Sequence, residues 1–242
     1  MIMGYLKNNQ KIDMNLLDKN LWEYEVDWGT HVNLPTVNNS LDNIHWNSDG
    51  SVSFDVQYSD TPIFPGWERD ANWNKVPTLT NYSAGLIISK EKYGFGTYEM
   101  NFKVPNFRGS WPAWWMFDKN KLPPEIDIFE HFRKDCFLTR FHLTTSYHDG
   151  PTYETGKSDS KARYNWLPID WKYITIKMIW TVDKAEFYYN NKKYYTMNKS
   201  DWPYYPTTPM NILVNSGVNP DWKLQVKKIS PFIVKSLTYE SL

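Results

Sequence analysis

Short stretches that alternate apolar and polar residues recur along this chain, and they constrain its fold more than any other feature. Residues 98–104 alternate Tyr, Met, Phe and Val with Glu, Asn and Lys, and residues 174–180 alternate Ile, Ile, Met and Trp with polar residues and one Ile. A third such stretch covers residues 51–58. A period of two is that of a β-strand, whose successive side chains point to opposite faces. Because Gly, Pro, Asn and Asp turns separate the stretches, the sequence predicts an antiparallel all-β sandwich or barrel.

The length of 242 residues suits one β domain of this kind. We therefore expect a single domain over residues 1–242, in which residues 1–20 form a loosely ordered N-terminal extension. Residues 57–81 break the alternation and are rich in Asp, Pro, Asn and Trp. They are predicted to form a long irregular segment, which either walls one end of a binding cleft or is a surface insertion.

Charge and composition argue against several classes of partner. The chain has 27 basic and 27 acidic residues, so no net field favours nucleic acid or an anionic membrane surface. No stretch approaches the roughly 20 apolar residues of a membrane span, and residues 1–20 lack the apolar core of a secretory signal, so no location is assigned. The single cysteine, Cys136, excludes an intramolecular disulfide. We expect a monomer that binds neither nucleic acid nor membranes.

The acidic segment at residues 125–130, Glu-Ile-Asp-Ile-Phe-Glu, carries the strongest functional signal. In an extended strand Glu125 and Asp127 share one face, whereas strict alternation puts Glu130 on the other. A β-bulge at residues 128–129 inserts one residue and restores the parity, and bulges are frequent beside active sites. The segment is therefore predicted to form a bulged strand that presents all three acids on one face.

Three neighbouring carboxylates repel one another and resist burial, so a purely structural role is costly. A retaining glycosidase uses such a set, with an ionised carboxylate as nucleophile and a protonated one that donates to the leaving oxygen, roughly 5–5.5 Å apart. The alternative is a solvated sheet face with its acids turned outward. Residues outside the segment decide between the two.

These residues resemble glycoside hydrolase family 16, whose signature is Glu-x-Asp-x-x-Glu in a bulged strand. Residues 109–116, Gly-Ser-Trp-Pro-Ala-Trp-Trp-Met, are similar to the family's Gly-x-Trp-Pro-Ala-aromatic-Trp strand. Residues 83–99 resemble the strand pair ahead of it, and residues 141–148, 170–181 and 209–215 resemble later strands. The resemblance covers about residues 83–222. It implies a jelly-roll β-sandwich of the concanavalin A type, with a concave face that binds a polysaccharide.

The resemblance implies a role for each acid: Glu125 is the nucleophile, Asp127 an assisting acid and Glu130 the general acid/base. It places Trp115 as the sugar platform beside the cleaved bond. Other contacts with the substrate are expected from His142, Glu99, Asn101 and Asn215. Many members have Glu-x-Arg where this chain has Glu99-Met100-Asn101, so Asn101 replaces an Arg that would contact sugar hydroxyls or charged substituents.

The chain has 13 Trp, 17 Tyr and 12 Phe, most of which are expected in β-cores. Trp67, Trp73 and Trp222 lie instead in stretches with Pro, Asn or Gly, where an exposed ring suits stacking on a sugar. His142 lies on the polar side of its predicted strand, which fits a cleft wall.

The predicted activity is endo-acting, retaining hydrolysis of a polysaccharide, with a β-1,3- or mixed β-1,3/1,4-glucan favoured by the neutral net charge and by Asn101. The resemblance also admits galactans of the agar, porphyran or carrageenan type. A transglycosylase and a non-catalytic carbohydrate-binding protein on the same fold stay open. No cofactor or catalytic metal is expected, since two carboxylates suffice for this chemistry. The resemblance allows a structural calcium ion, which no residue here locates.

Overall fold

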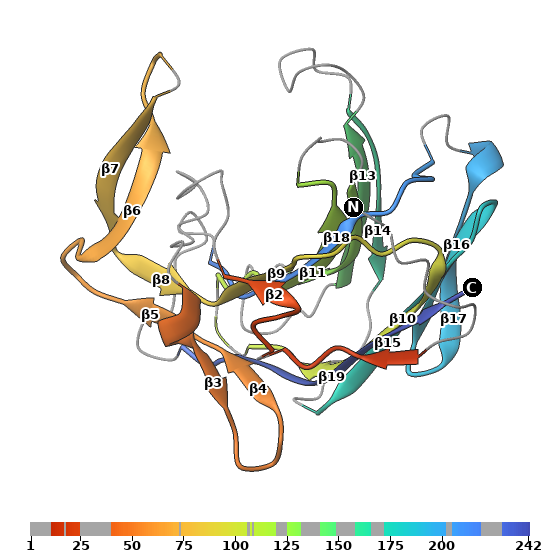
Figure 1. Cartoon of the computed structure of the whole chain (residues 1–242), viewed down its shortest axis with the longest axis horizontal. Helices are drawn as coiled ribbons and strands as arrows, with labels where there is room; N and C mark the ends of the chain where they lie inside the picture. The colour runs from red at the N-terminus through yellow and green to blue at the C-terminus, as the bar shows by residue number, and fades with distance from the viewer. Residues whose placement is uncertain are drawn as a thin grey trace.

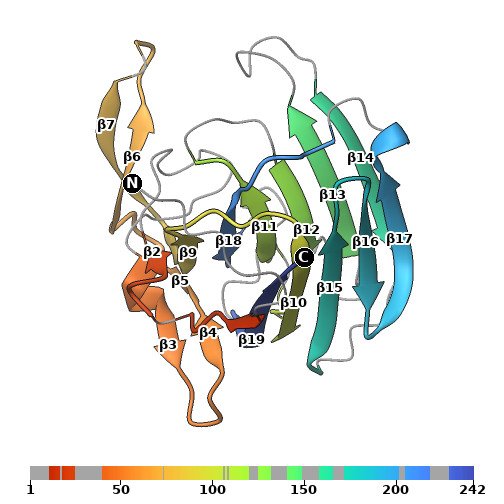
Figure 2. The same cartoon turned by 45° about the vertical axis from the view of Figure 1, so that its right-hand side comes forward.

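The protein is an antiparallel β-sandwich of jelly-roll type, as predicted, in which two large sheets pack face to face (Figures 1 and 2). It is seen in a computed structural model. The structure describes residues 11–16, 18–24, 40–72, 74–105, 107, 109–119, 125–131, 141–148, 158–165, 172–201, 205–218 and 229–242.

The first large sheet has eight strands in the order β17-β16-β15-β10-β19-β4-β3, with β1 also paired to β19. Its strands are β1 (Lys11–Asp13), β3 (Ile44–Trp46), β4 (Val52–Phe54), β10 (Gly96–Lys103), β15 (Ile174–Trp180), β16 (Lys184–Tyr189), β17 (Lys192–Asn198) and β19 (Phe232–Ser241).

The second large sheet has seven strands in the order β14-β13-β12-β11-β18-β9-β2. Its strands are β2 (Trp22–Glu23), β9 (Leu86–Ser89), β11 (Ala113–Phe117), β12 (Glu125–His131), β13 (Phe141–His148), β14 (Ser158–Asn165) and β18 (Asn211–Asn215). The acidic segment is therefore a central strand of this sheet.

Two small two-stranded sheets complete the described strands: β5 (Val56–Tyr58) pairs with β8 (Tyr82–Ala84), and β6 (Phe64–Arg69) forms a hairpin with β7 (Lys75–Thr80). Helical structure in the described ranges is limited to the 3-10 segments η1 (Ser40–Asn43) and η3 (Lys199–Asp201). None of it could cross a lipid bilayer.

One hydrophobic core fills the space between the two large sheets. In β10 and β15, buried and partly exposed residues alternate as the sequence predicted. The eight-stranded sheet contributes Phe102, whose ring centre lies 4.5 Å from that of Phe129 in the seven-stranded sheet. Residues 51–58 form two strands instead of one, because the chain leaves the eight-stranded sheet at Asp55 and then pairs with β8.

The expected N-terminal extension at residues 1–20 stays a prediction. The described residues of this stretch include β1, which pairs with β19, and Met14, which is buried in the core. Residues 57–81 are not irregular, because most of them form the β6–β7 hairpin, which projects from the body of the molecule in both views (Figures 1 and 2). Residues 1–10 lie outside the described part of the chain.

Gly96 allows β10 and β19 to approach closely, so we expect Gly96→Ala to be strongly destabilising. A Cβ atom at Gly96 would lie 2.5 Å from the carbonyl oxygen of Glu240 and 2.5 Å from the ring of Tyr239. Overpacking of this kind costs about 1–3 kcal/mol in the free energy of unfolding. Urea denaturation measures the loss. Gly94→Ala is the matched control, because its Cβ would meet only Pro209 Cγ at 3.6 Å. Equal stability of the two variants would contradict this account.

Candidate active site

A β-bulge in β12 lies at the predicted position. Next to β11, Phe129 pairs with Trp114, whereas Asp127 pairs with Trp115, so Ile128 is the extra residue in β12. Ile128 and Phe129 are consecutive, and both are buried in the core between the sheets. Because two successive residues face the core, the alternation of faces is shifted by one residue after the bulge. The bulge therefore changes the face on which Glu130 lies.

The three acids lie on the face of β12 that is turned away from the core. Glu125 pairs with Phe117, Asp127 with Trp115 and Glu130 with Ala113. Asp127 is only 5% exposed, while both glutamates are partly exposed. The predicted grouping of three carboxylates on one face is confirmed.

Trp115 lies on the same face as the acids, in the middle strand of the sheet, and its role as a sugar platform stays a prediction. Its ring stacks on that of Phe117, with 4.8 Å between ring centres and 27° between planes. Its indole Nε1–H donates to Asn215 Oδ1 at 3.0 Å. The structure thus brings together Trp115 and Asn215, two predicted contacts, and the hydrogen bond fixes the orientation of the indole.

Apolar residues of β18 and β9 continue from Trp115 on the same face of the seven-stranded sheet. Leu213 of β18 pairs with Trp115, and Ile88 of β9 pairs with Leu213. Both belong to a cluster with Leu86 and Phe117 that is separate from the core between the sheets. These four residues are buried, whereas Trp115 is partly exposed. The acids therefore lie on the same face as a partly exposed aromatic ring, a combination suited to binding a sugar.

Trp111 is a site residue to which the sequence reasoning assigned no role. Its indole Nε1–H donates to Glu130 Oε1 at 3.0 Å. Trp111 begins the Trp-Pro-Ala stretch, but only the folded arrangement of the strands brings its ring to the third acid. On the other side of β12, the backbone of His142 in β13 pairs with Glu130. The His142 side chain lies outside the described part of the structure.

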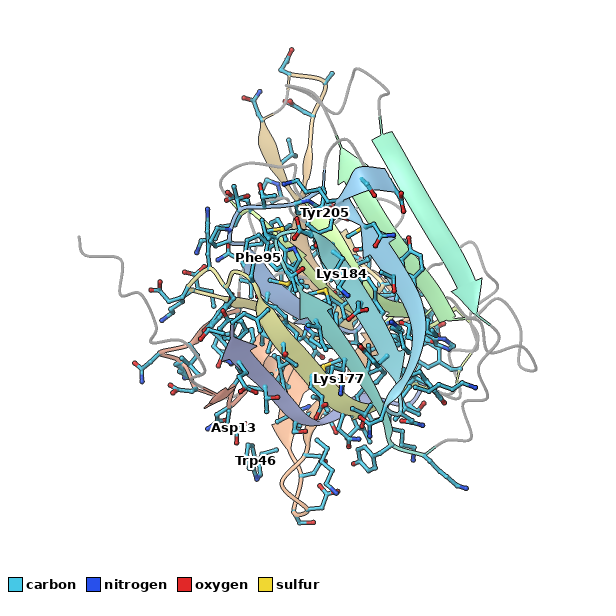
Figure 3. The ribbon with its side chains drawn as sticks, turned by 90° about the vertical axis from the view of Figure 1, so that its right-hand side faces the viewer. Asp13, Trp46, Phe95, Lys177, Lys184 and Tyr205 are labelled. Atoms are coloured by element: carbon cyan, nitrogen blue, oxygen red, sulfur yellow. The ribbon has the colours of Figure 1, made fainter. Side chains whose placement is uncertain are left out.

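The prediction that Glu99 and Asn101 contact the substrate was wrong. Both lie in β10 of the eight-stranded sheet, on the face opposite the core-facing residues Tyr98 and Met100. Glu99 pairs with Lys177, which lies on the outward surface seen in Figure 3. Packed sheets are about 10 Å apart, so the core separates these side chains from the acids of β12.

Trp73 and Trp222 lie outside the described residues. Trp67 is in β6, where its backbone pairs with Pro77, and its side chain is not described. The sugar contacts of these three tryptophans stay predictions.

A surface cavity of about 280 Å³ with polar and apolar lining residues lies beside the β3–β4 hairpin. His45 Nε2 and Asp55 Oδ2 are 3.2 Å apart there, and burial raises the pKa of the Asp55 carboxyl while His45 opposes the rise.

The described residues include no group of three or more His, Cys, Asp or Glu side chains that could hold a metal ion. The structural calcium ion stays an untested expectation.

Comparison with known proteins places the chain in a family. The model for glycosyl hydrolases family 16 matches residues 53–230. The chain belongs to this family. Within family 16, it is 24% identical over 226 residues to a keratan-sulfate endo-1,4-beta-galactosidase from Sphingobacterium multivorum, covering 83% of this chain and 50% of that protein. It is 25% identical over 157 residues to a beta-glucanase from Rhodothermus marinus, covering 58% of this chain and 54% of that protein.

Solved structures show the same family 16 fold. The laminarinase catalytic domain from Thermotoga maritima MSB8 superimposes with a TM-score of 0.66 at 17% identity, covering 98% of this chain and 99% of that one. The chain spans about half the length of the two curated relatives described above. The similarity therefore establishes the family and the sandwich.

Proposed function

We propose that the protein is an endo-acting, retaining glycoside hydrolase that cleaves internal β-linkages of a polysaccharide, with a β-1,3- or mixed β-1,3/1,4-glucan as its substrate. The observation that carries this proposal is the bulged strand β12, which sets Glu125, Asp127 and Glu130 on one face beside Trp115. Membership of a glycosyl hydrolase family supports it.

The proposed reaction has two steps on one face of the sheet. In the first, a Glu125 oxygen attacks the anomeric carbon as the glycosidic bond breaks, and Glu130 gives its proton to the departing oxygen. In the second, Glu130 takes a proton from water, and the water oxygen displaces Glu125 from the anomeric carbon. Two inversions return the original β configuration. Asp127, between the two glutamates, would assist by hydrogen bonding to the nucleophile.

The substrate proposal rests on similarity and charge. The beta-glucanase of Rhodothermus marinus is named for the substrate class that we propose. The chain has zero formal net charge, which suits a neutral glucan. Asn101 no longer supports this choice, since it lies on the outward face of the other sheet.

A β-galactoside is the second candidate, because one alignment favours it. The keratan-sulfate endo-galactosidase aligns over 83% of this chain, compared with 58% for the beta-glucanase. Agar-, porphyran- and carrageenan-type galactans belong to the same alternative.

Release of reducing ends from a panel of polysaccharides tests the proposal. Laminarin and mixed-linkage β-glucan are expected to be shortened to oligosaccharides, and proton NMR should show the β anomer as the first product. Faster cleavage of keratan sulfate or agarose would select the galactoside alternative. Longer products with an added acceptor would indicate a transglycosylase, and calorimetric binding without cleavage would indicate a carbohydrate-binding protein.

A further inference from the structure

We propose that Trp111 is a positioning residue for the general acid/base: its indole N–H holds Glu130 Oε1 and so assigns the transferable proton to Glu130 Oε2. This inference rests on the proposed function. It concerns a residue outside the acidic segment that contacts the third acid directly, through the 3.0 Å hydrogen bond from Nε1.

The backbone around Trp111 is anchored on both sides. The backbone N–H of Trp111 donates to Gly217 O at 2.8 Å, and the backbone N–H of His131 donates to Pro112 O at 3.1 Å. The preceding residue, Ser110, is fully buried and forms an isolated bridge with Val218. These contacts tie the segment before β11 both to the chain after β18 and to the end of β12. The indole donor is therefore preorganised, as a group that orients a catalytic carboxyl should be.

The chemistry of the hydrogen bond distinguishes the two Glu130 oxygens. An indole N–H donates and cannot accept, so Oε1 has to be an acceptor. In a protonated carboxyl group the carbonyl oxygen is the better acceptor, which leaves the proton on Oε2. When Glu130 is ionised, the same bond stabilises the carboxylate. Trp111 would thus orient the acid in the first step and stabilise the base at the start of the second.

The test removes the N–H and retains the ring. Trp111→benzothienylalanine replaces the indole N–H with sulfur at nearly the same shape, and Trp111→Phe is the genetically simpler variant. The substrates are the polysaccharide that the wild type cleaves fastest and the dinitrophenyl glycoside of its repeating disaccharide. The dinitrophenolate leaves without a proton, so its release does not need the general acid.

We expect kcat/KM for the polysaccharide to fall about tenfold in both variants. For the dinitrophenyl glycoside, kcat/KM, which reports formation of the glycosyl enzyme, should fall far less. The alkaline limb of the kcat/KM profile should move to higher pH, because the ionised Glu130 has lost a donor. Trp115→Phe is the matched control, because the Trp115 indole donates to Asn215 and not to Glu130. In this variant kcat/KM should fall by a similar factor on both substrates, and the alkaline limb of the pH profile should not move. Equal losses on both substrates in the Trp111 variants would overturn the proposal.

A measurement without turnover separates this inference from the proposed function. Carboxyl ¹³C NMR of labelled glutamate, assigned with Glu130→Gln, should show a higher pKa for Glu130 in Trp111→benzothienylalanine than in the wild type. An unchanged pKa would overturn the role of Trp111 even if the enzyme is active. Failure of the wild type to cleave any polysaccharide would count against the proposed function alone, and the titration would still decide the role of Trp111.

Discussion

Glu125→Gln is expected to lower turnover of the polysaccharide by roughly 10⁴–10⁶-fold, the range found when a covalent nucleophile is removed. A neutral amide cannot attack the anomeric carbon, so the first step has no nucleophile. Glu125 is partly exposed at a position outside the core, and glutamine has nearly the same shape. The free energy of unfolding should therefore change little. Steady-state reducing-end assays and urea denaturation measure the two quantities.

Chemical rescue checks that the lost group is the nucleophile. In Glu125→Ala, added azide can enter the vacated space and attack directly, giving an α-glycosyl azide from an activated β-glycoside. Glu99→Gln is the matched control, since Glu99 lies on the outward face of the other large sheet and its activity should equal that of the wild type. Wild-type turnover in purified Glu125→Gln would refute the assignment.

Glu130→Gln should lower turnover of the polysaccharide by about 10²–10⁴-fold, the usual contribution of a general acid/base. The loss should depend on the leaving group. A dinitrophenyl glycoside needs no protonation in the first step, so it should still form the glycosyl enzyme, which then accumulates because water lacks its general base. Rapid-quench kinetics should show a burst of dinitrophenolate followed by slow turnover.

The stereochemistry of azide rescue separates Glu130 from Glu125. In Glu130→Ala, azide attacks the glycosyl enzyme and should give a β-glycosyl azide, opposite to the product expected from Glu125→Ala. The two product anomers thus distinguish the two carboxylates by role. An equal loss on the polysaccharide and on the dinitrophenyl glycoside would show that Glu130 does not protonate the leaving group.

The face on which the acids lie could be predicted from sequence, because it depends only on how side chains alternate between the two faces of one strand. Glu130 lies five positions after Glu125, and the apolar pair Ile128-Phe129 offers one extra residue for the core, so a single bulge places all three acids on one face. The alternation in β10 and β15 was readable for the same reason. Each of these predictions needs only the period of a strand.

The errors concern information that local pattern does not contain. Alternation places Glu99 and Asn101 on one face of β10, but pairing with β15 and β19 decides which sheet that strand joins. The sheet assignment depends on contacts between residues far apart in sequence. The Trp111–Glu130 hydrogen bond was missed for a similar reason, because it depends on how the segment before β11 is anchored at Gly217.

The β6–β7 hairpin shows how composition can mislead. The proline content of residues 57–81 favoured an irregular segment, yet Pro65 and Pro77 lie within paired strands. Proline removes a ladder hydrogen bond and is tolerated in strands with an open edge. In this hairpin each strand pairs only with the other within the described part of the chain, so both strands keep such an edge.

Covalent trapping tests the role of the bulged strand most directly. The protein is incubated with a 2-deoxy-2-fluoro glycoside that carries a dinitrophenyl leaving group and the sugar preferred in the polysaccharide panel, and the labelled peptide is sequenced by mass spectrometry. The expected result is one glycosyl group per chain, attached to Glu125. A label attached to Asp127 or Glu130 would contradict the arrangement of nucleophile and acid that we infer from β12.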